Sequence, residues 1–158
     1  MSIELVRNYM KSFNRENDIM EFTVSSATVA LAAEALGVEP CRIAKTLSFK
    51  KDEVCILIVT AGDVKIDNAK FKHTFGMKAK MLTADEAVEL IGHAVGGVCP
   101  FAVKESVAGI YIDESVKRFE TVFPACGSSN SAIQLTPEEL YDLSKATAWV
   151  DVTKLMEA

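Results

Sequence analysis

Two apolar stretches, Arg42-Ile-Ala-Lys-Thr-Leu-Ser-Phe49 and Val54-Cys-Ile-Leu-Ile-Val-Thr60, flank the short polar segment Lys50-Lys-Asp-Glu53. The pattern predicts two antiparallel strands joined as a β-hairpin. Several other predicted strands also follow one another too closely for a crossover helix between parallel strands. We therefore expect an α+β fold, in which helices surround a mixed, mostly antiparallel sheet or a partly closed barrel.

The helices outside this hairpin are marked by local signals. Periodic apolar residues predict an N-terminal helix between residues 3 and 13, and Gly37 and Gly76 stand where helices end in a left-handed residue. Two capping boxes each open a helix. The expected helices are Ala27–Leu36 with Ser26 as N-cap, Asp67–Phe75, one from Thr83-Ala-Asp-Glu86 to about Ile91, and one from Thr136-Pro-Glu-Glu139 to about Lys145. The further expected strands are Ile19–Val24, Lys80–Leu82, Val98–Ala102, Gly109–Ile112, Glu120–Phe123, Ala132–Leu135 and Ala148–Val152.

The composition is that of an ordinary globular domain, with 158 residues, 49% hydrophobic and 25% charged. No repeat or flexible linker divides the chain, so we expect one domain over residues 1–158. The longest apolar runs are far shorter than the ~20 residues that cross a bilayer, and the charged N-terminal segment is unlike a signal peptide. These features predict a cytoplasmic protein without membrane contact.

The cysteines and histidines show no metal-binding spacing. Cys41, Cys55, Cys99 and Cys126 form no CxxC pair, and the histidines are His73 and His93. We therefore expect neither a metal nor a cofactor, and four reduced, mostly buried thiols. A nucleophilic Cys99 or Cys126 with His93 as its base is a further hypothesis, but Cys99 stands in an apolar segment that favours an inert thiol.

The charge is unevenly distributed. The net charge is -5, yet residues 45–80 contain eight lysines and four acids. An acidic protein with one basic face is suited to holding a polyanion at one place. The alternative is that these lysines only solvate turns and helix faces.

Three segments contain candidate binding groups. Lys45 lies beside Thr46 in an apolar strand, where its ammonium could hold a phosphate or polarise a carbonyl; it could equally lie on the solvent side. Gly96-Gly97, followed by Pro100, could present backbone N–H groups to an oxyanion, or form a tight turn. The loop Gly127-Ser-Ser-Asn-Ser131 could line a pocket with Gly127 and Ser128, or be an ordinary hairpin loop. It contains no P-loop motif.

These segments, in this order, resemble the YbaK/ProX family of prolyl-tRNA-synthetase-associated editing domains. The resemblance covers roughly Phe22 to the C-terminus. The matching motifs are Leu36-Gly37, Ile43-Ala-Lys-Thr-Leu47, Val59-Thr60, Asp67-x-x-Lys70, Val95-Gly-Gly-Val-Cys-Pro100 and Ile133-Gln-Leu135. The Lys-Thr and Gly-x-x-x-Pro motifs are each loose, but their pairing across this strand order is fairly specific.

The resemblance implies a trans-editing hydrolase that removes a small non-cognate amino acid from mischarged tRNA, most simply tRNAPro. Lys45 matches the essential lysine of the family, which holds the tRNA end or polarises the ester carbonyl. Gly96, Gly97 and Pro100 match the loop that positions the aminoacyl group and the attacking water. The implied partners are the acceptor end of tRNA, which the basic segment 45–80 could face, and prolyl-tRNA synthetase. No general base or metal is implied.

Some residues bear on specificity. Ser25, Ser26 and Thr28 precede or open the helix that walls the family's pocket, so they are candidates for contacting the amino acid. In the cysteine-specific branch an acidic residue falls near Ala132, and the loop equivalent to Gly127–Ser131 is basic. Both departures argue against cysteinyl specificity and leave alanyl, seryl, threonyl or another small residue open. The alternative function is a non-catalytic module that binds an aminoacyl-tRNA or a synthetase.

Overall fold

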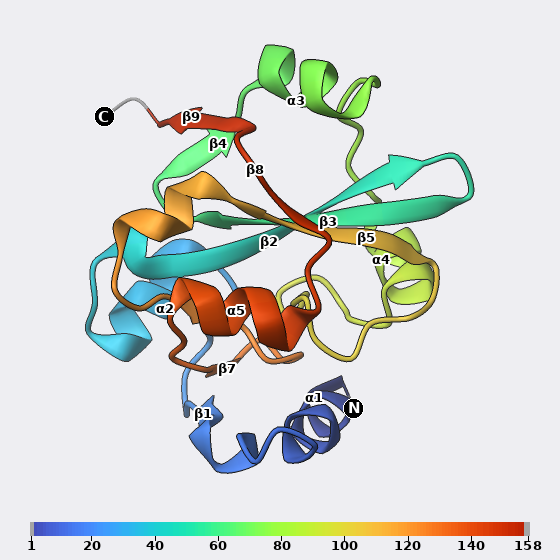
Figure 1. The fold of residues 1–158 in the computed structure, drawn as a ribbon. Coiled ribbons are helices and arrows are strands. Elements are labelled where there is room, and N and C mark those ends of the chain that lie inside the picture. Colours follow the sequence, from blue (N-terminus) through green and yellow to red (C-terminus); the bar gives the residue numbers. More distant parts are fainter. Residues whose placement is uncertain (1, 157–158) are drawn as a thin grey trace.

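A central five-stranded sheet organises the computed structural model, which describes residues 2–156 (Figure 1). Its strand order is β6-β2-β3-β5-β8, and two short two-stranded sheets, β1-β7 and β4-β9, lie outside it. The strands are β1 Met20–Glu21, β2 Ile43–Lys51, β3 Val54–Ala61, β4 Val64–Ile66, β5 Val107–Asp113, β6 Phe123–Pro124, β7 Ser131–Ala132, β8 Ala148–Val150 and β9 Thr153–Leu155. The α-helices are α1 Ser2–Lys11, α2 Val29–Leu36, α3 Asn68–Phe75, α4 Ala84–Leu90 and α5 Pro137–Ser144. The short 3-10 turns are η1 Glu16–Asp18, η2 Pro40–Arg42 and η3 Glu114–Arg118.

The predicted hairpin is confirmed as the antiparallel pair β2 and β3, with Lys51 opposite Val54. The α+β class and the mixed sheet are confirmed as well. The expectation that this sheet is mostly antiparallel is wrong, because β2-β6, β3-β5 and β5-β8 are all parallel pairs. The sheet is also an open one, with β6 and β8 at its edges. The apolar run of β3 reflects burial on both faces of the sheet, which is usual where strands are parallel and which removes the polar alternation.

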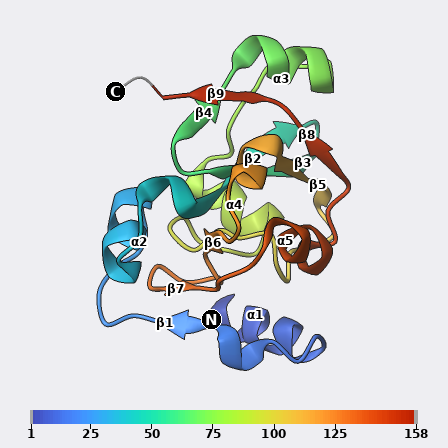
Figure 2. The ribbon, with the colours of Figure 1, turned by 60° about the vertical axis from the view of Figure 1, so that its left-hand side comes forward.

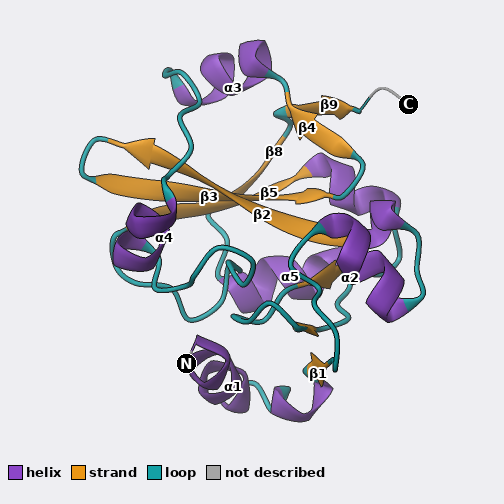
Figure 3. Cartoon of the chain, turned by 180° about the vertical axis from the view of Figure 1, so that it is seen from behind, coloured by secondary structure: helices purple, strands orange, loops and turns teal. Residues whose placement is uncertain are grey.

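Both faces of the sheet are covered. Leu57 and Val59 of β3 pack in one cluster with residues of α1, α4 and α5, whereas Ile56 and Ile58 pack with Phe71 of α3 in a second cluster. Seen from behind, α3 lies on one side of the sheet, and α1, α2 and α5 lie on the other (Figure 3). A third, smaller cluster joins α2 to β2 and β6 at the sheet edge. This edge positions the candidate site.

Most local helix signals are confirmed. Gly37 and Gly76 adopt left-handed conformations at the ends of α2 and α3, and both capping boxes are formed. The prediction that Ser26 caps the second helix is wrong. Thr28 is the N-cap, because its side chain accepts a hydrogen bond from the Leu31 N–H, and the helix begins at Val29.

Several strand predictions need correction. Residues 98–102 form an irregular buried segment in place of a strand, since Pro100 lacks an N–H for pairing and Ala102 has a positive φ of 53°. Lys80–Leu82 is reduced to a single bridge between Met81 and Phe49. Strands β4 and β9 were not predicted, because three-residue strands carry little periodicity. The division into one domain over residues 1–158 stays a prediction.

No helix among residues 2–156 has the length and apolar character needed to cross a membrane.

Candidate functional site

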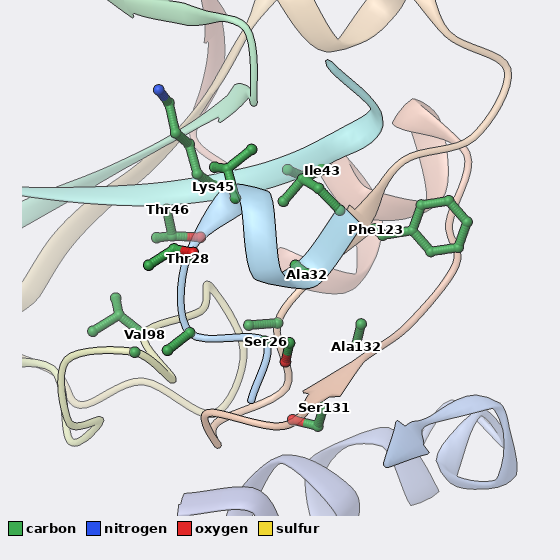
Figure 4. Close-up of a pocket in the computed structure, with 15 residues that line it drawn as sticks. Ser26, Thr28, Ala32, Ile43, Lys45, Thr46, Val98, Phe123, Ser131 and Ala132 are labelled. Atoms are coloured by element: carbon green, nitrogen blue, oxygen red, sulfur yellow. The ribbon is translucent and has the colours of Figure 1, made fainter. Parts of the chain in front are cut away.

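Helix α2 meets β2 and β6 at one edge of the sheet (Figure 2). A small cavity of about 150 Å³ opens there (Figure 4). Its wall combines four separate parts of the chain: the segment 26–32, the first half of β2, the loop around Gly96, and residues 123–132. The lining residues are Ser26, Ala27, Thr28, Val29, Ala32, Ile43, Ala44, Lys45, Thr46, Gly96, Val98, Phe123, Ala125, Ser131 and Ala132. The cavity therefore holds hydroxyl groups on a mainly aliphatic surface, with Lys45 as its one charged side chain.

Lys45 and Thr46 lie on opposite sides of β2, as successive residues of a strand do. Figure 4 shows Thr46 on the side of Thr28 and Val98, whereas the Lys45 ammonium points away across the strand. There Lys45 Nζ donates a hydrogen bond to the backbone carbonyl of Val64. Burial lowers the pKa of Lys45, and the nearby Asp63 carboxylate opposes that effect. The amine is therefore half-desolvated beside the cavity.

Thr46 carries an unsatisfied polar atom. Its hydroxyl oxygen is buried and has no hydrogen-bond partner among the described residues. A buried hydroxyl without a partner costs free energy, so it is a ready contact for a polar group that enters the cavity. Thr28, by contrast, already uses its side chain as the cap of α2.

The Gly96-Gly97 segment forms a tight turn at the wall of the cavity. Gly97 N–H donates to the Ala94 carbonyl at 3.0 Å, so the turn itself uses that donor. Gly96 has a positive φ of 97°, which favours glycine, and it lines the cavity. A Cβ on Gly97 would come within 2.8 Å of the backbone of Gly127 and Ser128. Both glycines thus hold the turn against two neighbouring segments.

The hydroxyl-rich loop supports the cavity more than it lines it. Ser128 Oγ lies 2.9 Å from Asn130 Oδ1 and 2.7 Å from Ser131 Oγ, and of these three only Ser131 reaches the cavity. The Ser129 carbonyl accepts bonds from the Ser26 N–H at 2.6 Å and the Ser26 hydroxyl at 3.3 Å. These contacts join the loop to the start of α2.

The structure thus brings together five of the ten proposed catalytic and binding residues: Lys45, Thr46, Ser26, Thr28 and Gly96. The others, Ser25, Gly97, Pro100, Gly127 and Ser128, are not among the lining residues. Pro100 is buried and lines a second cavity with Tyr9.

Sequence reasoning missed several wall residues. Phe123 and Ala125 carry no local signal for a site, because they reach the cavity only through the parallel pairing of β2 with β6. Ala132, singled out as the position of an acidic residue in the cysteine-specific branch, does line it.

The cysteine–histidine pair exists but is enclosed. His93 Nε2 lies 3.6 Å from Cys99 Sγ and 2.8 Å from the Phe101 carbonyl. Both side chains are fully buried, and burial raises the pKa of Cys99 to about 12 and lowers that of His93. A thiol held protonated and out of contact with solvent favours an inert structural role.

No group of three or more His, Cys, Asp and Glu side chains in residues 2–156 is arranged to hold a metal ion. The cavity wall contains no carboxylate.

The cavity lies in a small α+β domain, and the family of this domain follows from its similarity to known proteins. The family model for the aminoacyl-tRNA editing domain matches residues 23–143, and the chain belongs to this family. It is 55% identical to the uncharacterized protein YwhH of Bacillus subtilis, over 98% of both chains. It is also 30% identical to a proline--tRNA ligase of Shouchella clausii over 85% of this chain, which spans 23% of that longer enzyme. A crystal structure of a proposed trans-editing enzyme for prolyl tRNA synthetase superposes with a TM-score of 0.86 at 27% identity, over 97% of both chains.

Proposed function

We propose that this protein is a trans-editing deacylase, which hydrolyses the ester between a small amino acid and the 3′-terminal ribose of a mischarged tRNA. The observation that carries the proposal is that Lys45, Thr46 and Gly96 all line one small cavity, with the Lys45 ammonium itself directed to the other side of β2. Lys45 and Gly96 are about fifty residues apart in the chain, and each belongs to a motif that the resemblance associates with this reaction.

The chemistry requires few groups. The oxygen of a water molecule bonds to the ester carbonyl carbon, the bond from that carbon to the ribose oxygen breaks, and the ribose oxygen takes up a proton. Because an aminoacyl ester is activated, orientation and charge stabilisation can supply the catalysis. Lys45 is the cation that could stabilise the carbonyl oxygen or hold the adjoining phosphate, and Gly96 lies where the aminoacyl group would rest.

The cavity also indicates the size of the amino acid. A volume of about 150 Å³ walled by Ala32, Ala44 and Val98 suits a small side chain. Ala132 offers no charge to that side chain. We therefore propose alanyl, seryl or threonyl esters as substrates, on tRNAPro first, with prolyl-tRNA synthetase as the enzyme whose errors are corrected. The site of action would be the cytoplasm.

One observation favours a second candidate function. The Lys45 ammonium bonds to the Val64 carbonyl and points away from Thr46 (Figure 4). If it stays there when a ligand binds, the cavity would hold an aminoacyl end without polarising its ester. The protein would then be a binding module for aminoacyl-tRNA or for a synthetase.

The test is hydrolysis of a panel of labelled alanyl-, seryl-, threonyl-, cysteinyl- and prolyl-tRNAPro by the wild type, Lys45→Ala and Lys11→Ala. Lys11 is an exposed lysine of α1 that does not line the cavity, and it serves as the matched control. We expect at least one small aminoacyl ester to be lost at a rate that only Lys45→Ala reduces. Turnover equal to the spontaneous rate on every species, together with tight binding of one of them, would favour the binding module.

A further inference from the structure

Three depressions follow one another from the cavity to the tip of the β2–β3 hairpin. The first, about 330 Å³, shares Lys45 with the cavity. The second, about 450 Å³, shares Asn68 and Ala79 with the first, and the third, about 630 Å³, shares Lys78 with the second. They form one track between β2, β4, α3 and the segment 76–81, which we term the lysine groove.

The lysine groove is strongly basic. Seven lysines and a single acid, Asp52, line it. The lysines are Lys45, Lys50, Lys51, Lys65, Lys72, Lys78 and Lys80. Of these, Lys50 pairs with Glu86, whereas the five exposed lysines form no ion pair within residues 2–156. On a protein with a net charge of -5, this face is a local positive region.

The rim of the groove carries a further sign of an anionic partner. Lys65 of β4 lies directly opposite Lys154 of β9 in an antiparallel pair, and both side chains are exposed. Like charges at directly opposed positions destabilise a sheet. The Asp67 carboxylate is near enough to interact with Lys154, and a bound anion would further offset the charge of Lys65.

The length of the groove distinguishes a polymer from a single phosphate. Lys45 and Lys51 are six residues apart on one strand, which places them about 20 Å apart at ~3.3 Å per residue. One strand of duplex DNA carries a phosphate about every 3.4 Å along its axis, and at a similar spacing this length of a duplex faces about six phosphates. Exposed lysines are point charges that suit such a backbone, and they read no sequence.

We propose that the lysine groove binds the phosphate backbone of the tRNA acceptor stem and leads its 3′ end past Lys45 into the cavity. This inference rests on the proposed function for the identity of the nucleic acid. It assigns tRNA affinity to lysines that lie outside the cavity. Lys72 and Lys78 then contribute to binding of the stem and have no part in hydrolysis of the ester.

The test compares Lys72→Glu/Lys78→Glu with the control Lys11→Glu/Lys104→Glu, which changes the net charge equally at exposed lysines outside the groove. Binding of uncharged tRNAPro is measured by fluorescence anisotropy between 50 and 200 mM salt. We expect the groove variant to bind at least tenfold more weakly and to have a salt slope lower by about 2, with the control close to wild type. Thermal unfolding midpoints establish that both variants are folded.

A second measurement separates this inference from the proposed function. An aminoacylated 3′-terminal trinucleotide has no stem, so its hydrolysis should be equal in the wild type and the groove variant. Equal tRNA binding by the groove variant and the control would overturn the inference, even where the wild type hydrolyses mischarged tRNA. If tRNA binding depends on the groove lysines but no aminoacyl-tRNA is hydrolysed, the groove is confirmed as a tRNA-binding surface and the proposed deacylase activity is overturned.

Discussion

Lys45 and Val64 are joined by a hydrogen bond from the lysine ammonium to the valine carbonyl, on the side of β2 away from the Thr46 hydroxyl. The bond places the one cation of the cavity wall at the junction of the cavity with the lysine groove. Under the proposed function, Lys45 would act from this position on the phosphate beside the ester. It would reach the ester carbonyl only if its side chain left the Val64 carbonyl.

The charge of Lys45 predicts a pH dependence. Burial lowers its pKa below the usual 10.5, so the ammonium is lost as the pH rises through the lowered value. The Lys45-dependent rate is the deacylation rate of the wild type minus that of Lys45→Ala. We expect it to exceed the rate of Lys45→Ala by ~10²-fold at neutral pH. It should fall as the pH rises through the lowered pKa of Lys45. The measurement is deacylation against pH, corrected for spontaneous hydrolysis.

Lys45→Arg is the control for that profile, because a guanidinium stays charged throughout. Its residual activity should show no alkaline decline. A Lys45-dependent rate that instead rises with pH would mean that the neutral amine acts as a base.

Replacing Thr46 with valine should separate stability from activity. The hydroxyl has no partner in the described structure, so Thr46→Val removes no hydrogen bond and should raise the free energy of unfolding by up to about 1 kcal/mol. If the hydroxyl contacts the substrate, the rate of deacylation should fall about tenfold.

Thr28→Val is the control for this prediction, because loss of the α2 cap should lower the free energy of unfolding by about 1 kcal/mol. Chemical denaturation and deacylation assays measure both. A stability loss in Thr46→Val would show that the hydroxyl has a structural partner.

A methyl group at Gly97 should disturb the cavity. The added Cβ would lie 2.8 Å from the backbone of Gly127 and Ser128, so the two loops must separate. We expect Gly97→Ala to lose about 1–3 kcal/mol of stability and most of the activity. Gly37→Ala is the matched control. The Cβ added by this substitution would meet nothing within 4 Å, so no neighbouring segment has to move. The φ of 68° at the end of α2 is unfavourable for alanine, so Gly37→Ala should lower the free energy of unfolding about as much as Gly97→Ala does. Equal activity per folded molecule in the two variants would contradict a role for the turn.

Cys99→Ser tests the nucleophile hypothesis. The thiol is fully buried and its pKa is raised to about 12, so we expect the variant to retain activity within about twofold. The serine hydroxyl can still donate to the Phe101 carbonyl, as the thiol does. A folded Cys99→Ser protein without activity would establish a cysteine-dependent hydrolase.

The capping box of α4 predicts an acid-sensitive contribution to stability. The Glu86 carboxylate accepts a hydrogen bond from the Thr83 N–H and forms an ion pair with Lys50 at 2.5 Å. Together these contacts lower the pKa of Glu86 to about 2, and the contact with Lys50 has the larger effect. A depressed carboxyl pKa stabilises the fold above pH ~4.5 and loses that effect as the pH falls toward 2. Glu86→Gln should therefore have a lower unfolding midpoint than the wild type at pH 6, and the gap should close near pH 2. Glu89→Gln, without an ion pair in the described structure, should show no such gap.

Short-range signals could be read directly from the residues. Gly37, Gly76 and the capping boxes at Thr83 and Thr136 stop or start helices through bonds that span no more than four residues. The hairpin follows equally locally from a polar segment between apolar ones. The motifs around Lys45 and Gly96 were visible for the same reason, as short patterns of residue types.

The long-range arrangement has no such local code. The parallel pairing of β3 with β5 joins segments about fifty residues apart, and it depends on burial of both faces of β3 in two separate clusters. The same packing brings Phe123, Ala125 and Ala132 to the cavity. It also leaves the Thr46 hydroxyl without a partner, while Ser128 is bonded within its own loop. Residue types thus predicted the kind of site, whereas the packing of distant strands determines which side chains line the cavity, because burial is shared by the whole sheet.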